Sequence, residues 1–221
     1  RVKYDFTNWL SIQARTGTDF YTDNRFAMIP QGTPGSANLN GQVRNTIWRV
    51  KEENSDVLLT ATGDISDNLS ATFSAGANHL NREQEVVEVR GENLAIRDLY
   101  HISNASLVFP RNRVERKQMN SLYFQGQLAY KNYLFLDVTG RNDWSSTLGL
   151  ENQSFFYPSV STSFAFTDAF LMNSKILTFG KLRASYAEAG NDSDPYRTTG
   201  GYSLNDVSFN GLRMATIQGT V

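Results

Sequence analysis

The stretch RVERKQMNSLYFQGQLAYKNYLFLDVTGRN, residues 113–142, has the clearest pattern in this sequence of 221 residues. Apolar residues and glycines occupy every second position on both sides of its centre: Leu122, Phe124, Gly126, Leu128 and Tyr130, then Leu134, Leu136, Val138 and Gly140. Side chains of a β-strand point alternately to opposite faces, so this repeat of two indicates two strands. Lys131 and Asn132 lie between them, and Asn tolerates the positive φ of a tight turn. The stretch therefore predicts an antiparallel hairpin with one apolar and one polar face.

The length of the alternation indicates the environment of this hairpin. It persists for ten residues or more, whereas the mean strand of a globular protein has about 5–6. A tilted strand needs about 9–11 residues to cross a bilayer. Tyr130, Tyr133 and Phe135 lie close to the turn, where aromatic side chains would meet a membrane interface. We therefore predict that the hairpin is part of the wall of a transmembrane β-barrel.

The composition excludes several other classes. The formal net charge is −1 and there is no cysteine. The first gives no electrostatic footprint for nucleic acid, and the second excludes disulfides and thiolate metal sites. A mean hydropathy of −0.42 is too polar for a helical membrane protein, but the strands of a barrel alternate and hide their lipid face in the average. The sequence contains no run of 18 apolar residues, so no membrane-spanning helix is predicted.

The rest of the chain is expected to continue the all-β pattern. Dyad repeats predict further strands near residues 2–6, 9–18, 57–64, 69–77, 159–166 and 181–186, with weaker strand character at 202–209. Long connections are predicted at about residues 19–54, 81–112, 143–155 and 190–221, and short turns alternate with them. About eight antiparallel strands result, with short periplasmic turns and long extracellular loops. The alternative is a soluble β-sandwich that binds carbohydrate, with shorter strands and apolar faces packed together.

Three motifs then connect the chain to a known family. They are RNDWSS at residues 141–146, FYPS at 156–159 with Ser161 and Phe164, and LRASY at 182–186 followed by Gly190 and Asn191. In this order and spacing they resemble blocks in the barrel of the SusC/RagA family of TonB-linked outer-membrane transporters. The segment DLYHISN, residues 98–104, also resembles a loop of that family. The matching motif residues are Arg141, Asp143, Ser145, Ser146, Pro158, Ser159, Arg183, Gly190 and Asn191.

The resemblance implies the architecture and the partners of the complete transporter. The expected barrel has about 22 strands, the size of a plugged transporter, and the chain would supply about eight of them from its C-terminal half. It would lie in a bacterial outer membrane, in contact with lipid, and import oligosaccharides or peptides with a SusD-like surface lipoprotein as a lid. TonB would act through an N-terminal plug domain. Neither a plug nor a signal peptide is recognised here, because the chain opens directly in a strand-like pattern; we expect a fragment of the barrel.

Five residues are candidates for the rim or for ligand contact: Trp48, Tyr100, Arg141, Asp143 and Trp144. The aromatic three are expected in loops, where their rings could stack on sugars or pack against the interface. Arg141 and Asp143 are expected at the start of an upper loop, either touching substrate or pairing with each other to stiffen the rim.

No residue set predicts catalysis or a cofactor. The acidic residues Glu83, Glu85 and Glu88 have nothing to position them, so they are interpreted as a solvated loop. The run Asp192-Ser193-Asp194 lacks the glycine and the distal glutamate of a calcium loop. His79 and His101 are isolated in the sequence. We therefore predict no catalytic residue, no metal site and no cofactor, and a protein that is not an enzyme.

Overall fold

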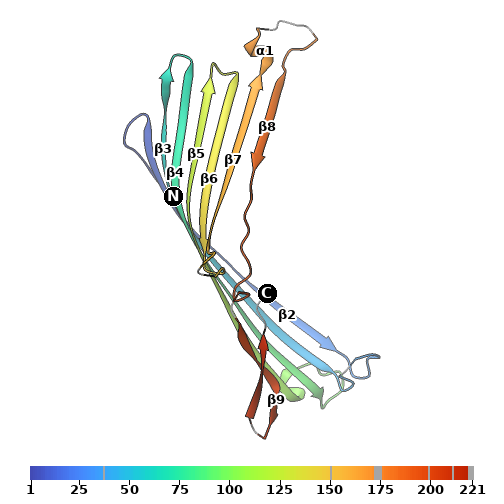
Figure 1. The fold of residues 1–221 in the computed structure, drawn as a ribbon. Coiled ribbons are helices and arrows are strands. Elements are labelled where there is room, and N and C mark those ends of the chain that lie inside the picture. Colours follow the sequence, from blue (N-terminus) through green and yellow to red (C-terminus); the bar gives the residue numbers. More distant parts are fainter. Residues whose placement is uncertain (37, 150, 172–175, 199, 211, 219–221) are drawn as a thin grey trace. The chain divides into compact units, whose positions relative to one another are not determined.

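The computed structural model describes residues 1–221 except 37, 150, 172–175, 199, 211 and 219–221. Its elements in chain order are β1 (Val2–Asp5), β2 (Leu10–Ile29), β3 (Gln42–Ser66), β4 (Leu69–Leu94), η1 (Ile102–Asn104), β5 (Ala105–Tyr130), β6 (Leu134–Ser145), β7 (Ser154–Ala165), α1 (Phe166–Ala169), β8 (Lys181–Ala187), β9 (Gly201–Phe209) and β10 (Leu212–Gln218). Strands β1 to β8 form one sheet in sequence order, and β9 pairs with β10 (Figure 1). The predicted all-β antiparallel class is confirmed.

The chain divides into two compact units. The first comprises Arg1–Gly17, Glu53–Leu80 and Gln118–Asp194, and the second comprises Thr18–Glu52, Asn81–Lys117 and Pro195–Val221. The first unit contains the paired residues of the β5–β6 hairpin and all three motifs.

The predicted hairpin is confirmed in register. Tyr123 lies opposite Arg141 and Leu128 opposite Leu136 in the antiparallel pair β5–β6. Lys131 and Asn132 both have positive φ, 46° and 59°, as the turn requires. Pairing resumes at Leu134, opposite Tyr130, so the connection has one residue more than the minimal turn.

The same two faces continue across the neighbouring strands. Val138 pairs with Val160, and Val160 in turn with Tyr186. One residue away, Asp137 pairs with Ser161, which pairs with Ser185. Because paired residues point to the same side of an antiparallel sheet, all apolar positions share one surface, here called the apolar face, and the others form the polar face.

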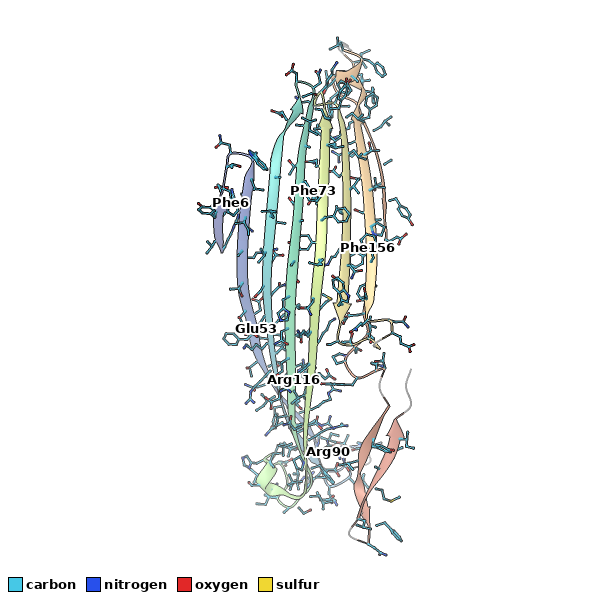
Figure 2. The ribbon with its side chains drawn as sticks, turned by 60° about the vertical axis from the view of Figure 1, so that its left-hand side comes forward. Phe6, Glu53, Phe73, Arg90, Arg116 and Phe156 are labelled. Atoms are coloured by element: carbon cyan, nitrogen blue, oxygen red, sulfur yellow. The ribbon has the colours of Figure 1, made fainter. Side chains whose placement is uncertain are left out.

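The burial of the two faces is the reverse of that in a water-soluble sheet. Large side chains of the apolar face are open to their surroundings, and Leu122 and Phe156 are 56% and 55% exposed. On the polar face, by contrast, Ser121 and Asp143 are only 2% and 3% exposed. Figure 2 labels two residues of the apolar face, Phe73 and Phe156. The described strands of the first unit lie in a single sheet, so within this unit they provide no second sheet of the kind that the sandwich alternative requires.

Aromatic rings gather where the short turns lie. Tyr133 makes edge contacts with Tyr130 and Phe164, with ring centroids 5.7 and 6.1 Å apart. Phe164 also contacts Phe170, at 5.9 Å. The backbone N–H of Lys131 donates to the carbonyl of Asn68, so the β5–β6 turn is tied to the β3–β4 turn. Among the described residues, no helix is long and apolar enough to cross a membrane.

The long connections are shorter than predicted. Strand β2 runs to Ile29 and β3 begins at Gln42, so residues 30–41 connect them; β4 runs to Leu94 and β5 begins at Ala105. Strands also extend into the region 143–155, leaving residues 146–153, and the hairpin β9–β10 occupies much of 190–221. The loop bounds of about 19–54, 81–112, 143–155 and 190–221 were therefore wrong. In the first two regions, charged side chains on both sides of the strands hide the alternation.

Cross-strand ion pairs stabilise these extensions in the second unit. Arg49 pairs with Glu85 at 2.9 Å and Arg116 with Glu83 at 2.7 Å. These glutamates therefore lie in a paired strand and not in a solvated loop. Val43, Val50 and Leu94 provide a small apolar core in this unit.

Candidate functional site

The site is built on the polar face of β6, where the first motif begins. Arg141 Nε donates to Asp143 Oδ1 at 2.8 Å, and Arg141 Nη2 donates to Ser121 Oγ at 2.7 Å. Tyr157 on β7 donates its hydroxyl to the other oxygen of Asp143. The buried carboxylate is thus neutralised by one cation and held by two donors, as a buried charge requires.

A second group extends this network to two more strands, β2 and β3. Tyr123 on β5 donates its hydroxyl to Asp56 Oδ2 on β3 at 2.6 Å, and Arg15 on β2 contacts the other oxygen of Asp56 at 3.2 Å. Arg141 lies 5.7 Å from the centre of the Tyr123 ring. The two buried aspartates are therefore joined through Tyr123 and Arg141, and this polar network connects β2, β3, β5, β6 and β7.

Gly76 on β4 provides the space for this connection. A Cβ at this position would lie 2.5 Å from Cζ of Tyr123 and 2.6 Å from its hydroxyl. The Tyr123 side chain therefore crosses β4 at Gly76, where no side chain obstructs it, to contact Asp56 on β3.

The second half of the first motif is hydrogen-bonded to the residues that follow the third motif. Ser145 Oγ donates to Asp192 Oδ2 at 2.6 Å, and Thr147 Oγ1 donates to the same oxygen at 3.3 Å. Ser193 Oγ donates to the carbonyl of Thr147 at 3.2 Å. Ser146 accepts from the N–H of Gln118 at 2.9 Å and so fastens the loop to β5. The sequence predicted the motif residues but not Asp192, which closes the contact between the two segments.

The other motif residues have local roles. Ser159 hydrogen-bonds Thr139 across β6–β7, and the carbonyl of Pro158 accepts from the N–H of Glu188. A Cβ on Gly190 would lie 2.5 Å from the Phe155 ring, so glycine allows a close approach there. Arg183 lies on the polar face of β8, opposite Ser163. Asn191 is exposed.

The five rim candidates do not form one cluster. Arg141, Asp143 and Trp144 lie within β6 and Trp48 within β3, so the expectation of loop positions was wrong for these four. Arg141 and Asp143 lie on the polar face, and the alternation places Trp144 on the apolar face.

Trp48 and Tyr100 belong to the second unit. The guanidinium of Arg25 lies 5.2 Å from the centre of the Trp48 ring. Tyr100 lies in the connection before η1, and its hydroxyl donates to Asp98 at 3.2 Å. The pKa of Tyr100 is raised, mainly by partial desolvation and, to a smaller extent, by this hydrogen bond.

Asn104 holds the connection around Tyr100 in place. Its side-chain amide donates to the carbonyls of Ile96 and Leu99 at 2.8 and 2.7 Å, and its carbonyl oxygen accepts from the N–H of Ile96. The DLYHISN segment is thus ordered by its own last residue.

The sequence also gave no indication of Asp56, Tyr123, Ser121 or Gly76 as members of a network. Their only signal is that polar or small residues occur at positions of the polar face. In the part of the chain that the structure describes, no group of three or more His, Asp and Glu side chains is placed to hold a metal ion.

Comparison with known proteins agrees with the barrel interpretation. No protein-family model matches the chain. TonB-dependent receptor P26 of Formosa agariphila is 30% identical over 183 residues, which are 79% of this chain and 18% of that receptor. The RagAB peptide transporter structure matches with a TM-score of 0.81 at 20% identity, over 99% of this chain and 25% of that one. The RagAB peptide importer in its open-open state matches with a TM-score of 0.79 at 20% identity, over 99% of this chain and 24% of that one.

The chain thus spans between 18% and 25% of the length of the relatives it matches. The likeness to the solved transporters covers the whole sheet, and the identity to the curated receptor covers most of the sequence. The exposed apolar face, the three motifs in order and both comparisons lead to one assignment: the chain belongs to the TonB-dependent receptors of the SusC/RagA type and forms part of their β-barrel.

Proposed function

We propose that this chain is a section of the barrel wall of an importer in a bacterial outer membrane. The observation that supports this most is the reversed burial of the sheet: Leu122 and Phe156 are exposed, whereas Ser121 and Asp143 are buried. In water such a surface would be unfavourable, because each Å² of apolar surface left exposed to water forgoes about 25 cal/mol of stabilisation. Against lipid it becomes the expected arrangement of an outer-membrane strand.

In this proposal the apolar face contacts outer-membrane lipid and the polar face lines the barrel interior. The turns at residues 67–68 and 131–133 are periplasmic, and the aromatic cluster around Tyr133 lies at the periplasmic interface. The connections at residues 30–41, 95–104 and 146–153 and the β9–β10 hairpin are extracellular. The whole chain is then one partial barrel domain.

The complete protein would import oligosaccharides or peptides. A ligand is captured outside, enclosed by a SusD-like surface lipoprotein, and released when the TonB complex pulls on a plug domain. The name of the Formosa receptor includes TonB dependence, and RagAB is described as a peptide transporter; both support this class. The relatives are receptors and transporters, which supports a function other than catalysis.

The residues of the candidate site take different parts in this function. The network around Arg141 and Asp143 stiffens the wall, because both groups already have intramolecular partners. Trp48 and Tyr100 are the candidates for ligand contact, since aromatic faces suit sugars and amphipathic peptides. Trp144 lies on the apolar face and serves as an anchor at the membrane interface.

The test is the purification of the full-length protein from outer membranes in detergent. We expect a polypeptide several times larger than these 221 residues, together with a lipoprotein partner. Deletion of its gene, or of TonB, should abolish uptake of the same oligosaccharide or peptide. Recovery of a product of the size of this chain from the aqueous fraction would overturn the proposal.

A further inference from the structure

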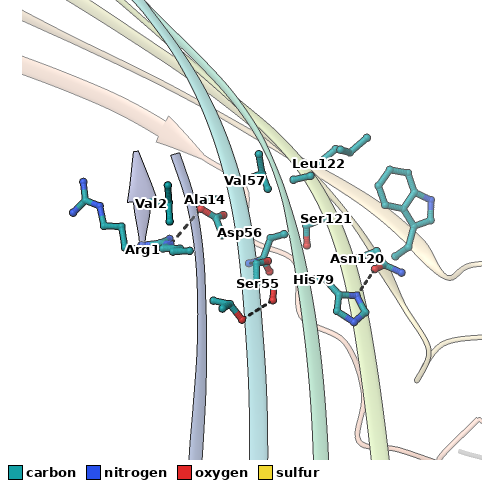
Figure 3. Close-up of a pocket in the computed structure, with 15 residues that line it drawn as sticks. Arg1, Val2, Ala14, Ser55, Asp56, Val57, His79, Asn120, Ser121 and Leu122 are labelled. Carbon is teal, nitrogen blue, oxygen red and sulfur yellow. Dashed lines mark hydrogen bonds and ion pairs between the residues drawn. The ribbon is translucent and has the colours of Figure 1, made fainter. Parts of the chain in front are cut away.

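A groove of about 730 Å³ lies in the first unit, at the end of the apolar face away from the short turns. Figure 3 shows the residues around it. Its apolar lining comes from six side chains: Val2, Ala14, Val57, Ala77, Leu122 and Trp144. Ala14 and Ala77 are the small members of this set, so β2 and β4 leave a hollow between the larger side chains of β3, β5 and β6.

Two hydrogen-bonded pairs of polar side chains also line the groove. Thr16 Oγ1 and Ser55 Oγ are 2.9 Å apart, and His79 Nδ1 and Asn120 Oδ1 are 2.7 Å apart. Each pair joins neighbouring strands. By the alternation, each lies on the apolar face, two residues beyond an apolar member of the same strand. On β2 to β5 the groove is therefore apolar toward the short turns and polar at its opposite end, where Trp144 of β6 lies opposite Asn120.

A third polar pair lies on the same face, between β6 and β7. Asn142 Nδ2 donates to Ser154 Oγ at 2.9 Å between β6 and β7, and both residues occupy apolar-face positions in the register. On β2 to β5 the two pairs Thr16–Ser55 and His79–Asn120 lie in one row, which continues on β6 with Trp144, opposite Asn120 and Ser154. Asn142 lies one step nearer the short turns, opposite Leu122 and Phe156. An amphipathic molecule that lies along this face would place its polar part at that row.

We infer that the groove holds an acyl chain of a membrane lipid, with the ester and headgroup region of the lipid at the pairs Thr16–Ser55 and His79–Asn120. The inference rests on the proposed function, because it needs the apolar face to meet lipid. The hydroxyl, imidazole and amide groups offer donors and acceptors to glycerol, ester or phosphate oxygens. An added peptide strand fits less well, since β2 to β5 lie inside the sheet and their backbone groups already pair with neighbouring strands.

The test places the photoreactive residue p-benzoyl-phenylalanine at position 122, inside the groove, or at position 128 of the full-length receptor. Leu122 and Leu128 share β5 and the apolar face, and only Leu122 lines the groove. In vesicles of palmitoyl-oleoyl phosphatidylethanolamine, both positions should form adducts with the lipid. After extraction into detergent and extensive washing, only position 122 should retain the adduct, identified by mass spectrometry.

A blocking variant makes the test specific. Ala77→Trp, which fills the groove, should reduce the retained adduct at position 122 at least tenfold. Ala71→Trp, on the same face of β4 and outside the groove, should leave it unchanged. Loss of the adduct at both positions on washing, no effect of Ala77→Trp, or a peptide adduct at position 122 would each overturn the inference. Absence of any lipid adduct at position 128 in vesicles would instead overturn the proposed function.

Discussion

Tyr123 donates a 2.6 Å hydrogen bond to Asp56 across the whole width of strand β4, although the two residues are 67 positions apart in the sequence. The contact exists because Gly76 has no side chain to obstruct the tyrosine ring. It joins a buried carboxylate of β3 to the motif residues of β6 through Arg141. The stiffness of this part of the wall therefore depends on a residue that contributes no side chain.

Substitution of Gly76 should disrupt this connection. In Gly76→Ala the new Cβ would lie 2.5 Å from Tyr123, so the ring must move and its hydrogen bond to Asp56 is lost. We expect destabilisation of about 1–3 kcal/mol, measured by urea unfolding of the full-length receptor in detergent micelles. The matched control is Gly126→Ala, whose Cβ meets only Phe73 at 3.9 Å. Equal stability of the two variants would contradict the role of Gly76.

Removal of the hydroxyl alone should isolate the hydrogen bond. Tyr123→Phe keeps the ring and removes the 2.6 Å hydrogen bond to Asp56, at a cost of about 1–3 kcal/mol. In a double-mutant cycle with Asp56→Asn, the two effects should be less than additive, because each change removes the same contact. Strictly additive losses would show that the two groups act independently.

The ion pair of the first motif should be more costly to break. Asp143→Ala leaves Arg141 without its carboxylate partner in a poorly hydrated position, and about 3–5 kcal/mol of stability should be lost. Asp137→Ala, on the same face of β6, serves as control; it removes a hydrogen bond from Gln127 and should cost about 1 kcal/mol. The readout is the same unfolding transition. A small effect at Asp143 would argue for a ligand-binding role instead.

Asp192 should hold the two motif segments together. Asp192→Ala removes the acceptor that Ser145 and Thr147 share. We expect cleavage near residues 188–196 by an added protease to become at least tenfold faster. The neighbouring exposed residue provides the control, since Asn191→Ala should leave the cleavage rate unchanged. Equal cleavage rates in the two variants would show that Asp192 does not hold the two motif segments together.

Charges on the apolar face should impair assembly. Phe73→Arg and Leu128→Arg should each cost about 2–4 kcal/mol if these positions lie near the middle of the bilayer. Gln125→Arg, on the polar face of β5, should be tolerated. The fraction of folded receptor in outer membranes, read from the heat-dependent shift in gel mobility, gives the result. Normal assembly of both apolar-face variants would count against lipid contact.

The sequence predicted what depends on local alternation. The β5–β6 hairpin, its turn at Lys131 and Asn132, and the two faces of β7 and β8 all follow from a repeat of two. The lengths of β2 to β5 did not follow, because residues such as Arg49, Glu83, Glu85 and Arg116 place charges where a half-buried strand would have apolar groups. Their strand character becomes clear only when each charge meets its partner on the next strand.

The site was only partly accessible from the sequence for a similar reason. The motifs identified Arg141, Asp143, Ser145 and Gly190, but no spacing rule connects Asp56 with Tyr123. Trp144 shows the opposite limit: it is adjacent to Asp143 in sequence, yet one step along a strand reverses the face. Proximity in a motif therefore does not imply a shared site.

The row of polar pairs at Thr16–Ser55 and His79–Asn120 also indicates the thickness of the apolar band. Between this row and the turn, β5 offers nine residues, Leu122 to Tyr130. At a rise of about 3.4 Å per residue and a tilt of about 40°, they span roughly 23 Å. A protein with such a band matches a thin membrane, and in a thicker one either the bilayer must compress or the polar pairs must enter the hydrocarbon. Because hydrophobic mismatch costs only a fraction of a kcal/mol per Å, this wall would favour thin membranes over thick ones without being confined to one thickness.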